Sequence, residues 1–219
     1  IYTLQSVDEA LEVESESVHN NGLAPASIGL PGEISYETAK SICDEVQNSK
    51  TVALSVSNNI EEIIEMVMFV KPDILHLCGE PGELNASRVK ILRDCLQSND
   101  MEIPIMQAIS VEDMSAVEFA KEYEDVSDYF ILDTSTSLVQ GVGASGKVHD
   151  WNVSKAIVDS VKIPVILAGG LSPENVRDAI EKVKPWGVDS LTHTNKILDN
   201  GDFVKDITKV RKFFKSATG

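Results

Sequence analysis

Basic residues are scarce in this chain of 219 residues. It has 19 Lys and Arg against 35 Asp and Glu, which gives a formal net charge of −16 at pH 7. A surface this acidic repels nucleic acid and anionic lipid, so we expect neither nucleic acid nor a membrane as a partner. An anionic small molecule would have to be held locally, by backbone amides and a few basic groups.

Cysteines and long apolar runs are scarce too. Cys43, Cys78 and Cys95 are widely spaced and form no CxxC or Cys/His pattern, which argues against a disulfide framework and against a metal site. No apolar run reaches the length of a membrane span, and no stretch has the pattern of a signal peptide. We therefore expect a cytoplasmic protein without a metal centre.

What the chain does have is a regular alternation of strand-like and helix-like stretches. Short apolar runs bounded by turn residues predict strands, and apolar residues that recur at helical spacing predict the helices between them. The predicted strands cover residues 1–4, a weak stretch within 22–30, 51–56, 72–77, 103–108, 129–133, 163–168 and 186–191. The predicted helices cover residues 7–13, 35–46, 60–67, 85–96, 111–123 (capped by Ser110), 150–161, 173–183 and 202–215.

Eight strand–helix units in this length predict an α/β fold, a (β/α)8 TIM barrel that forms one domain over residues 1–219. The alternative is an open, doubly wound sheet. It is less favoured, because no GxGxxG motif follows the first strand and because eight units suit closure of the sheet.

Polar residues at the carboxyl ends of the predicted strands are the candidates for chemistry, because the active site of such a barrel lies there. They are His76, Cys78, Gln107, Asp133, Thr192 and His193. Asp133 ends an apolar strand, and partial burial would raise its pKa and suit it to general acid or base catalysis. The alternative is a carboxylate that caps the loop by accepting hydrogen bonds from the amides of residues 135 and 136.

Two glycines, Gly169 and Gly170, follow the apolar run 163–168, and Ser172 has the position of a helix N-cap. Glycine amides in front of a helix N-terminus favour anion binding. The alternative is an ordinary strand–loop–helix turn that binds nothing. A second glycine-rich loop, residues 141–147, contains a lysine but lacks the spacing of a P-loop.

Taken together, these stretches resemble the phosphoribosylanthranilate isomerase family. Residues 132–134 match its Leu-Asp-Thr, 143–151 match its glycine-rich loop ending in Asp-Trp, and 164–176 match its Pro-x-x-Leu-Ala-Gly-Gly-Leu-x-x-x-Asn-Val. Residues 187–189 match the Gly-Val-Asp of its last strand. The resemblance implies a TIM-barrel isomerase of tryptophan biosynthesis, which opens the ring of a phosphoribosyl amine and completes an Amadori rearrangement without a cofactor.

By this resemblance Asp133 acts as the general acid, and Gly143, Gly169 and Gly170 contribute to a phosphate site. The implied partner is therefore a small phosphorylated substrate, bound by a monomer or a homodimer. Further candidates for contacts to the substrate or its phosphate are Gln107, Thr192 and His193.

The chain departs from the family pattern at the general base. The family has a cysteine at the end of the first strand, where this chain has Tyr2, and an unperturbed tyrosine with a pKa of about 10 is a poor base. Cys78 and His76 are candidate substitutes from the opposite side of the barrel.

Two substrate-binding motifs differ as well. The family's second loop has Ser-Pro-Arg, whereas no arginine precedes Arg88 in this chain. The family also has small residues after its eighth strand, and bulkier residues replace them at 190–195 in this chain. Three hypotheses follow: an isomerase of the family's type, another sugar-phosphate isomerase, aldolase or epimerase on the same barrel, or a non-catalytic ligand-binding descendant.

Overall fold

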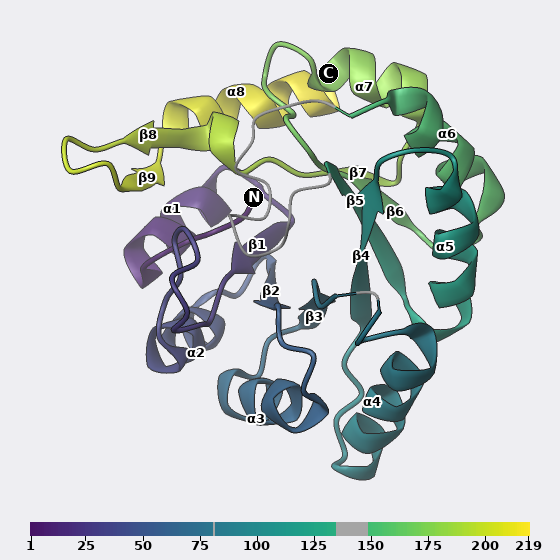
Figure 1. Ribbon diagram of the computed structural model, residues 1–219. Coiled ribbons are helices and arrows are strands. Elements are labelled where there is room, and N and C mark those ends of the chain that lie inside the picture. Colours follow the sequence, from purple (N-terminus) through teal and green to yellow (C-terminus); the bar gives the residue numbers. More distant parts are fainter. Residues whose placement is uncertain (81, 135–148) are drawn as a thin grey trace.

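Seven parallel strands follow one another around a curled sheet in their order along the chain (Figure 1). The computed structural model describes residues 1–80, 82–134 and 149–219. The strands are β1 (Asn20–Leu23), β2 (Lys50–Ser55), β3 (Ile74–Leu77), β4 (Ile105–Val111), β5 (Tyr129–Thr134), β6 (Val165–Leu167) and β7 (Gly187–Val188). This sequential order rules out the doubly wound alternative, in which the strand order reverses.

The first residues of the chain close the gap between β1 and β7. The amide of Gly22 donates to the carbonyl of Ile1 at 2.8 Å, and the amide of Leu4 donates to the carbonyl of Gly22 at 3.1 Å. On the other side, the amide of Tyr2 donates to the carbonyl of Ser190 at 3.4 Å. The segment thus occupies the place of the first predicted strand, and the predicted (β/α)8 barrel is confirmed.

Regular strand geometry is interrupted in this segment at Thr3, whose φ is +61°. A β-branched residue rarely adopts that conformation, which favours glycine.

Eight helices surround the sheet on the outside (Figure 1). They are α1 (Val7–Ser15), α2 (Tyr36–Glu45), α3 (Ile60–Val70), α4 (Ala86–Ser98), α5 (Ser115–Tyr123), α6 (Trp151–Ser160), α7 (Val176–Val183) and α8 (Ile207–Thr218). Most begin at a side chain that accepts a hydrogen bond from an amide of the first turn; the capping residues are Ser6, Ser35, Asn59, Asn85, Asp150 and Asp206. None of the described helices is long and apolar enough to cross a membrane.

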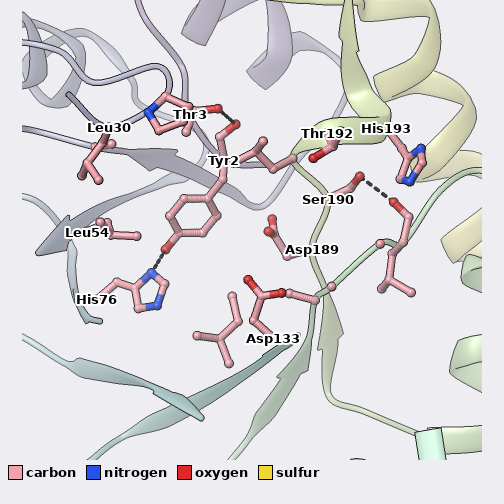
Figure 2. Close-up of a pocket in the computed structure, with 18 residues that line it drawn as sticks. Tyr2, Thr3, Leu30, Leu54, His76, Asp133, Asp189, Ser190, Thr192 and His193 are labelled. Carbon is pink, nitrogen blue, oxygen red and sulfur yellow. Dashed lines mark hydrogen bonds between the residues drawn. The ribbon is translucent and has the colours of Figure 1, made fainter. Parts of the chain in front are cut away.

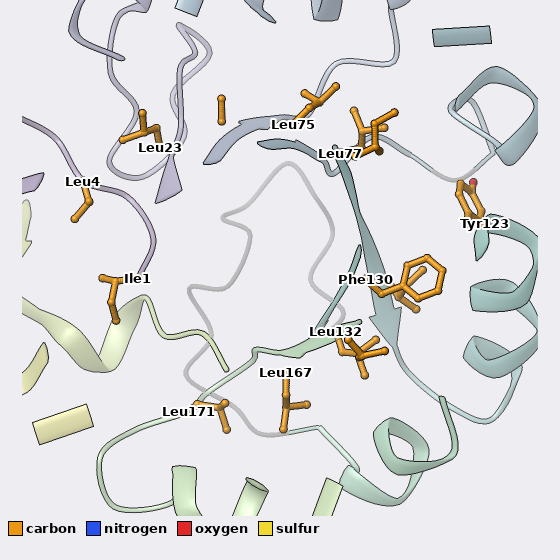
Figure 3. Close-up of a cluster of buried hydrophobic side chains, with 14 of the residues drawn as sticks. Ile1, Leu4, Leu23, Leu75, Leu77, Tyr123, Phe130, Leu132, Leu167 and Leu171 are labelled. Atoms are coloured by element: carbon orange, nitrogen blue, oxygen red, sulfur yellow. The ribbon is translucent and has the colours of Figure 1, made fainter. Parts of the chain in front are cut away.

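Side chains alternate between two cores. On β5, Phe130 and Leu132 point outward into the large core between strands and helices, together with residues such as Leu75 and Leu167 (Figure 3). Ile131 between them points inward, into the smaller core of the barrel interior. Both faces of β5 are therefore buried between Phe130 and Leu132, which explains why this part of the strand is a continuous apolar run rather than an alternating one.

Some predicted boundaries were wrong. Ser110 does not cap a helix, because β4 continues to Val111 and the α5 turn instead uses Asp113, whose carboxylate accepts from the amide of Ser115 at 2.8 Å. Ser172 opens a separate turn by accepting from the amide of Glu174 at 3.2 Å, and α7 begins only after Asn175.

A hairpin also lies where part of the last helix was predicted. Its strands, β8 (Asn195–Ile197) and β9 (Phe203–Lys205), pair antiparallel outside the main sheet. It follows a short 3-10 helix, η2 (Thr192–Thr194), and a second 3-10 helix, η1 (Glu124–Val126), follows α5.

We predict that Gly22→Ala will lower the free energy of unfolding by about 1–3 kcal/mol, because overpacking forces neighbouring groups to shift. A Cβ atom at Gly22 would lie 2.5 Å from Cγ and Cδ1 of the Tyr2 ring. Urea denaturation followed by circular dichroism measures the change. The control is Gly82→Ala, where a Cβ would meet nothing within 4 Å. Equal stabilities of the two variants would contradict the close seating of Tyr2 on β1.

Candidate active site

A pocket lies at the carboxyl ends of the barrel strands, where the sequence predicted an active site. Figure 2 shows side chains from opposite sides of the barrel converging on it. Its described lining comprises Tyr2, Thr3, Ala24, Leu30, Pro31, Leu54, His76, Ile131, Asp133, Ala168, Gly169, Gly170, Leu171, Asp189, Ser190, Leu191, Thr192 and His193. No lysine or arginine is among these described lining residues.

Asp133 points into the pocket from the end of β5. Burial raises its pKa to about 7, and the negative charge of Asp189 adds to the rise, whereas a hydrogen bond from the amide of Thr134 opposes it. That hydrogen bond is 2.7 Å long. Near neutral pH the carboxyl group is thus partly protonated, as a general acid requires. Residues 135 and 136, the predicted partners of a loop cap, lie outside the described residues.

Tyr2, His76 and Cys78 form a hydrogen-bonded line across the barrel interior. The Tyr2 hydroxyl lies 2.5 Å from His76 Nδ1, and His76 Nε2 lies 3.1 Å from Cys78 Sγ. Cys78 is buried in the inner core and is not among the described residues that line the pocket.

Burial keeps all three groups uncharged. It lowers the pKa of His76 to about 3. It raises the pKa of the Cys78 thiol, as does the charge of Asp133. Burial, followed by the charges of Asp189 and Cys78, also raises the pKa of Tyr2. Neither the phenol nor the thiol therefore yields an anion readily near neutral pH.

Asp189 is a second carboxylate in the pocket, and the sequence analysis did not select it. Asp189 directly follows β7, just as Asp133 lies at the end of β5. The rule that the active site of a barrel lies at the carboxyl ends of its strands would therefore have predicted Asp189 as well. Its Oδ1 lies 3.1 Å from the backbone nitrogen of Ile1. Figure 2 shows Asp189 and Asp133 next to each other, beside the Tyr2 ring.

Gly169 and Gly170 form the pocket wall after β6, with φ of +80° and +66°. Behind them lies His149, another residue that the sequence analysis missed. Its Nε2 lies 2.6 Å from Ser154 Oγ, and its Nδ1 lies 3.3 Å from Thr134 Oγ1. Burial lowers the pKa of His149 to about 4, so a neutral imidazole supports the glycine turn.

Thr192 and His193 reach the rim of the pocket from η2, as predicted from their place after the last strand. A buried lysine of β9 supports this turn: Lys205 Nζ donates to Asn195 Oδ1 at 2.6 Å and to the carbonyl of Leu191 at 3.5 Å. Burial lowers the pKa of Lys205 to about 8.

Gln107, a predicted site residue, does not line the pocket, and neither does Cys78. Met106 points into the barrel, so Gln107, the next residue of β4, lies on the opposite face, where its Nε2 donates to the carbonyl of Ala108 at 3.0 Å. Gly143 lies outside the described residues. Within the described ranges, no three His, Cys, Asp or Glu side chains are grouped so that they could hold a metal ion.

Comparison with known proteins gives a consistent picture. The family model "N-(5'phosphoribosyl)anthranilate (PRA) isomerase" matches residues 3–216. The N-(5'-phosphoribosyl)anthranilate isomerase of Methanocella arvoryzae is 35% identical over 158 residues, which cover 70% of this chain and 66% of that relative.

Solved structures agree with this match. The phosphoribosyl anthranilate isomerase from Thermotoga maritima has a TM-score of 0.78 at 28% identity, over 100% of this chain and 97% of that chain. A phosphoribosyl anthranilate isomerase in complex with reduced 1-(o-carboxyphenylamino)-1-deoxyribulose 5-phosphate has a TM-score of 0.74 at 25% identity, over 99% and 96% of the two chains.

We predict that Gly169→Ala will destabilise the protein more than Gly201→Ala. Both glycines have a φ between +80° and +89°, so alanine is strained at either position. A Cβ at Gly169 would in addition lie 2.6 Å from Thr134 Oγ1 and 2.9 Å from His149 Nδ1, whereas one at Gly201 would meet nothing within 4 Å. Thermal unfolding of the two variants isolates this contact, and equal losses of stability would contradict the packing described.

Proposed function

The chain belongs to the phosphoribosylanthranilate isomerase family, and on that premise we propose that it converts N-(5'-phosphoribosyl)anthranilate to its ribulose isomer in tryptophan biosynthesis. The observation that carries this proposal is Asp133, a half-buried carboxyl group at the mouth of the barrel, where desolvation raises its pKa to about 7. A phosphorylated substrate does not cross a membrane by itself and so stays in the compartment where it is made. We therefore place the reaction in the cytoplasm.

In this reaction Asp133 donates its proton to the ring oxygen of the substrate. The bond between that oxygen and C1 breaks, and the electrons of the amine nitrogen form an iminium group. Loss of the proton from C2 then gives an enolamine, which tautomerises to the ketone. The substrate and the product are isomers that differ only in the positions of hydrogen atoms and bonds. The reaction therefore requires no external oxidant or reductant.

The phosphate site that we propose consists of the turn at Gly169 and Gly170 together with Thr192 and His193. All four line one side of the pocket. In an otherwise acidic protein, backbone amides at the glycine turn and one imidazole give the local positive potential that a phosphate requires. The positive φ of both glycines turns the backbone there without a side chain in the way.

A second candidate function is isomerisation of a different sugar phosphate. It is favoured by Tyr2, which stands where the family has its base cysteine and whose hydroxyl is 2.5 Å from His76 Nδ1. Binding and turnover assays distinguish the two candidates. An isomerase of another phosphosugar would bind that compound and would not turn over the anthranilate-bearing substrate.

We predict that Asp133→Asn will lower kcat by at least about 100-fold, the usual contribution of a general acid. Turnover of freshly generated phosphoribosylanthranilate is followed by the loss of anthranilate fluorescence. Asp199→Asn is the matched control, because Asp199 is exposed in the turn between β8 and β9. An Asp133→Asn variant as active as this control would refute the assignment.

We also predict that kcat/KM will fall by about tenfold per pH unit above pH 7, because Asp133 must carry its proton to act. Its folded pKa is raised to about 7, so the protonated form persists up to that pH, whereas an ordinary aspartic acid loses its proton near pH 4. The charged group that faces it is Asp189, and the uncharged Cys78 thiol lies near enough for the charge of Asp133 to raise its pKa. A rate that stayed constant to pH 9 would exclude a neutral Asp133 as the acid.

A further inference from the structure

We propose that Asp189 is the general base of this barrel, and that it removes the proton from C2 of the substrate after Asp133 has opened the ring. The inference rests on the proposed function and deepens it. It assigns the second proton transfer to a carboxylate on β7, on the side of the pocket opposite to His76 of β3.

The geometry places both carboxylates on one reacting region. Asp133 comes from the end of β5 and Asp189 directly follows β7, and Ala168, which follows the intervening strand β6, also lines the pocket. Figure 2 shows both carboxylates beside the Tyr2 ring, facing the same space. A substrate whose ring oxygen contacts Asp133 therefore has its C2 within the region that Asp189 borders.

The other titratable side chains of the lining are committed elsewhere. The Tyr2 hydroxyl contacts His76 Nδ1, and the second ring nitrogen of His76 contacts Cys78, so both ring nitrogens of His76 are engaged. The raised pKa of Tyr2 keeps the proton on its phenol near neutral pH. His193 lies on η2 at the rim of the pocket and is near enough to Glu174 to contribute to the lowering of its pKa. The rim position of His193 suits a contact with phosphate rather than with C2.

The two carboxylates have different surroundings. Asp189 Oδ1 lies 3.1 Å from the backbone nitrogen of Ile1, and the ammonium group of Lys205 is near enough to interact with its charge. Asp133 accepts only one amide hydrogen bond among those described, from Thr134. In a pair of carboxyl groups with unequal surroundings, one group can act as the acid and the other as the base.

The proton transfer balances within the pair. Asp189 forms an O–H bond as the C2–H bond breaks, and the released electron pair forms the C1–C2 double bond and neutralises the iminium nitrogen. Asp133, which gave its proton to the ring oxygen, is then a carboxylate. A proton passing from Asp189 to Asp133 restores both groups for the next turnover.

The test uses Asp189→Asn with substrate carrying deuterium or hydrogen at C2. We expect kcat to fall at least about 100-fold with KM nearly unchanged, and the deuterium isotope effect on kcat to exceed that of the wild type, because C2–H cleavage becomes the slow step. Asp199→Asn is again the control for removing one acidic charge. Fluorescence titration with reduced 1-(o-carboxyphenylamino)-1-deoxyribulose 5-phosphate checks that the variant still folds and binds.

Other outcomes separate the hypotheses. A kcat of Asp189→Asn within about threefold of the wild type would overturn the assignment of the base while leaving the proposed function intact. If Asp189→Asn does not fold, Asp189→Glu is used to test the assignment. Because the longer side chain displaces the carboxylate, this variant should have a lower kcat and a larger isotope effect. An unchanged kcat and isotope effect would refute the role of Asp189 as the base. A wild-type protein that fails to turn over the substrate at high enzyme concentration would instead refute the proposed function itself. Loss of kcat without a change of KM in His193→Gln would transfer the base to His193.

Discussion

The seating of the Tyr2 ring against the bare backbone of Gly22 is the contact on which the site depends. It fixes the segment that closes the barrel, because Gly22 also exchanges backbone hydrogen bonds with Ile1 and Leu4. It fills the centre of the barrel with an aromatic ring in the place where the related family has a small thiol. The ring reaches across to His76, and the space that remains is bordered by Asp133 and Asp189.

Burial of Asp133 beside a second carboxylate then sets the chemistry of the site. In the described part of the pocket no lysine or arginine contacts the two carboxylates, so desolvation and their mutual repulsion act together on Asp133. The same desolvation removes charge from His76 and keeps the proton on Cys78. The interior therefore holds neutral groups on the β3 side and one acidic proton on the β5–β7 side.

The sequence allowed the barrel, the order of its elements and the position of Asp133 to be predicted, because strand periodicity and strand ends are local patterns. The face of the sheet on which Gln107 lies was harder to predict, because a shift of one residue along β4 moves a side chain to the opposite face. The support given to Gly169 by His149 depends on contacts between distant segments, and no local pattern contains it. The hairpin of β8 and β9 was missed because its strands are only three residues long and carry exposed apolar residues such as Ile197.

The seam between the first and last strands has a consequence for how the molecule opens. β7 contains only two residues, and the described backbone hydrogen bond that joins it across the seam is the 3.4 Å contact from Tyr2 to Ser190. Thr3 has a φ of +61°, and the backbone strain at this residue is released when the segment detaches. Partial unfolding should thus begin here, and amide hydrogens of Leu4 and Gly22 should exchange with solvent ahead of those of β4 and β5. A ligand held between Asp133 and Asp189 spans the strands next to this seam, so occupancy of the pocket slows the opening of the barrel.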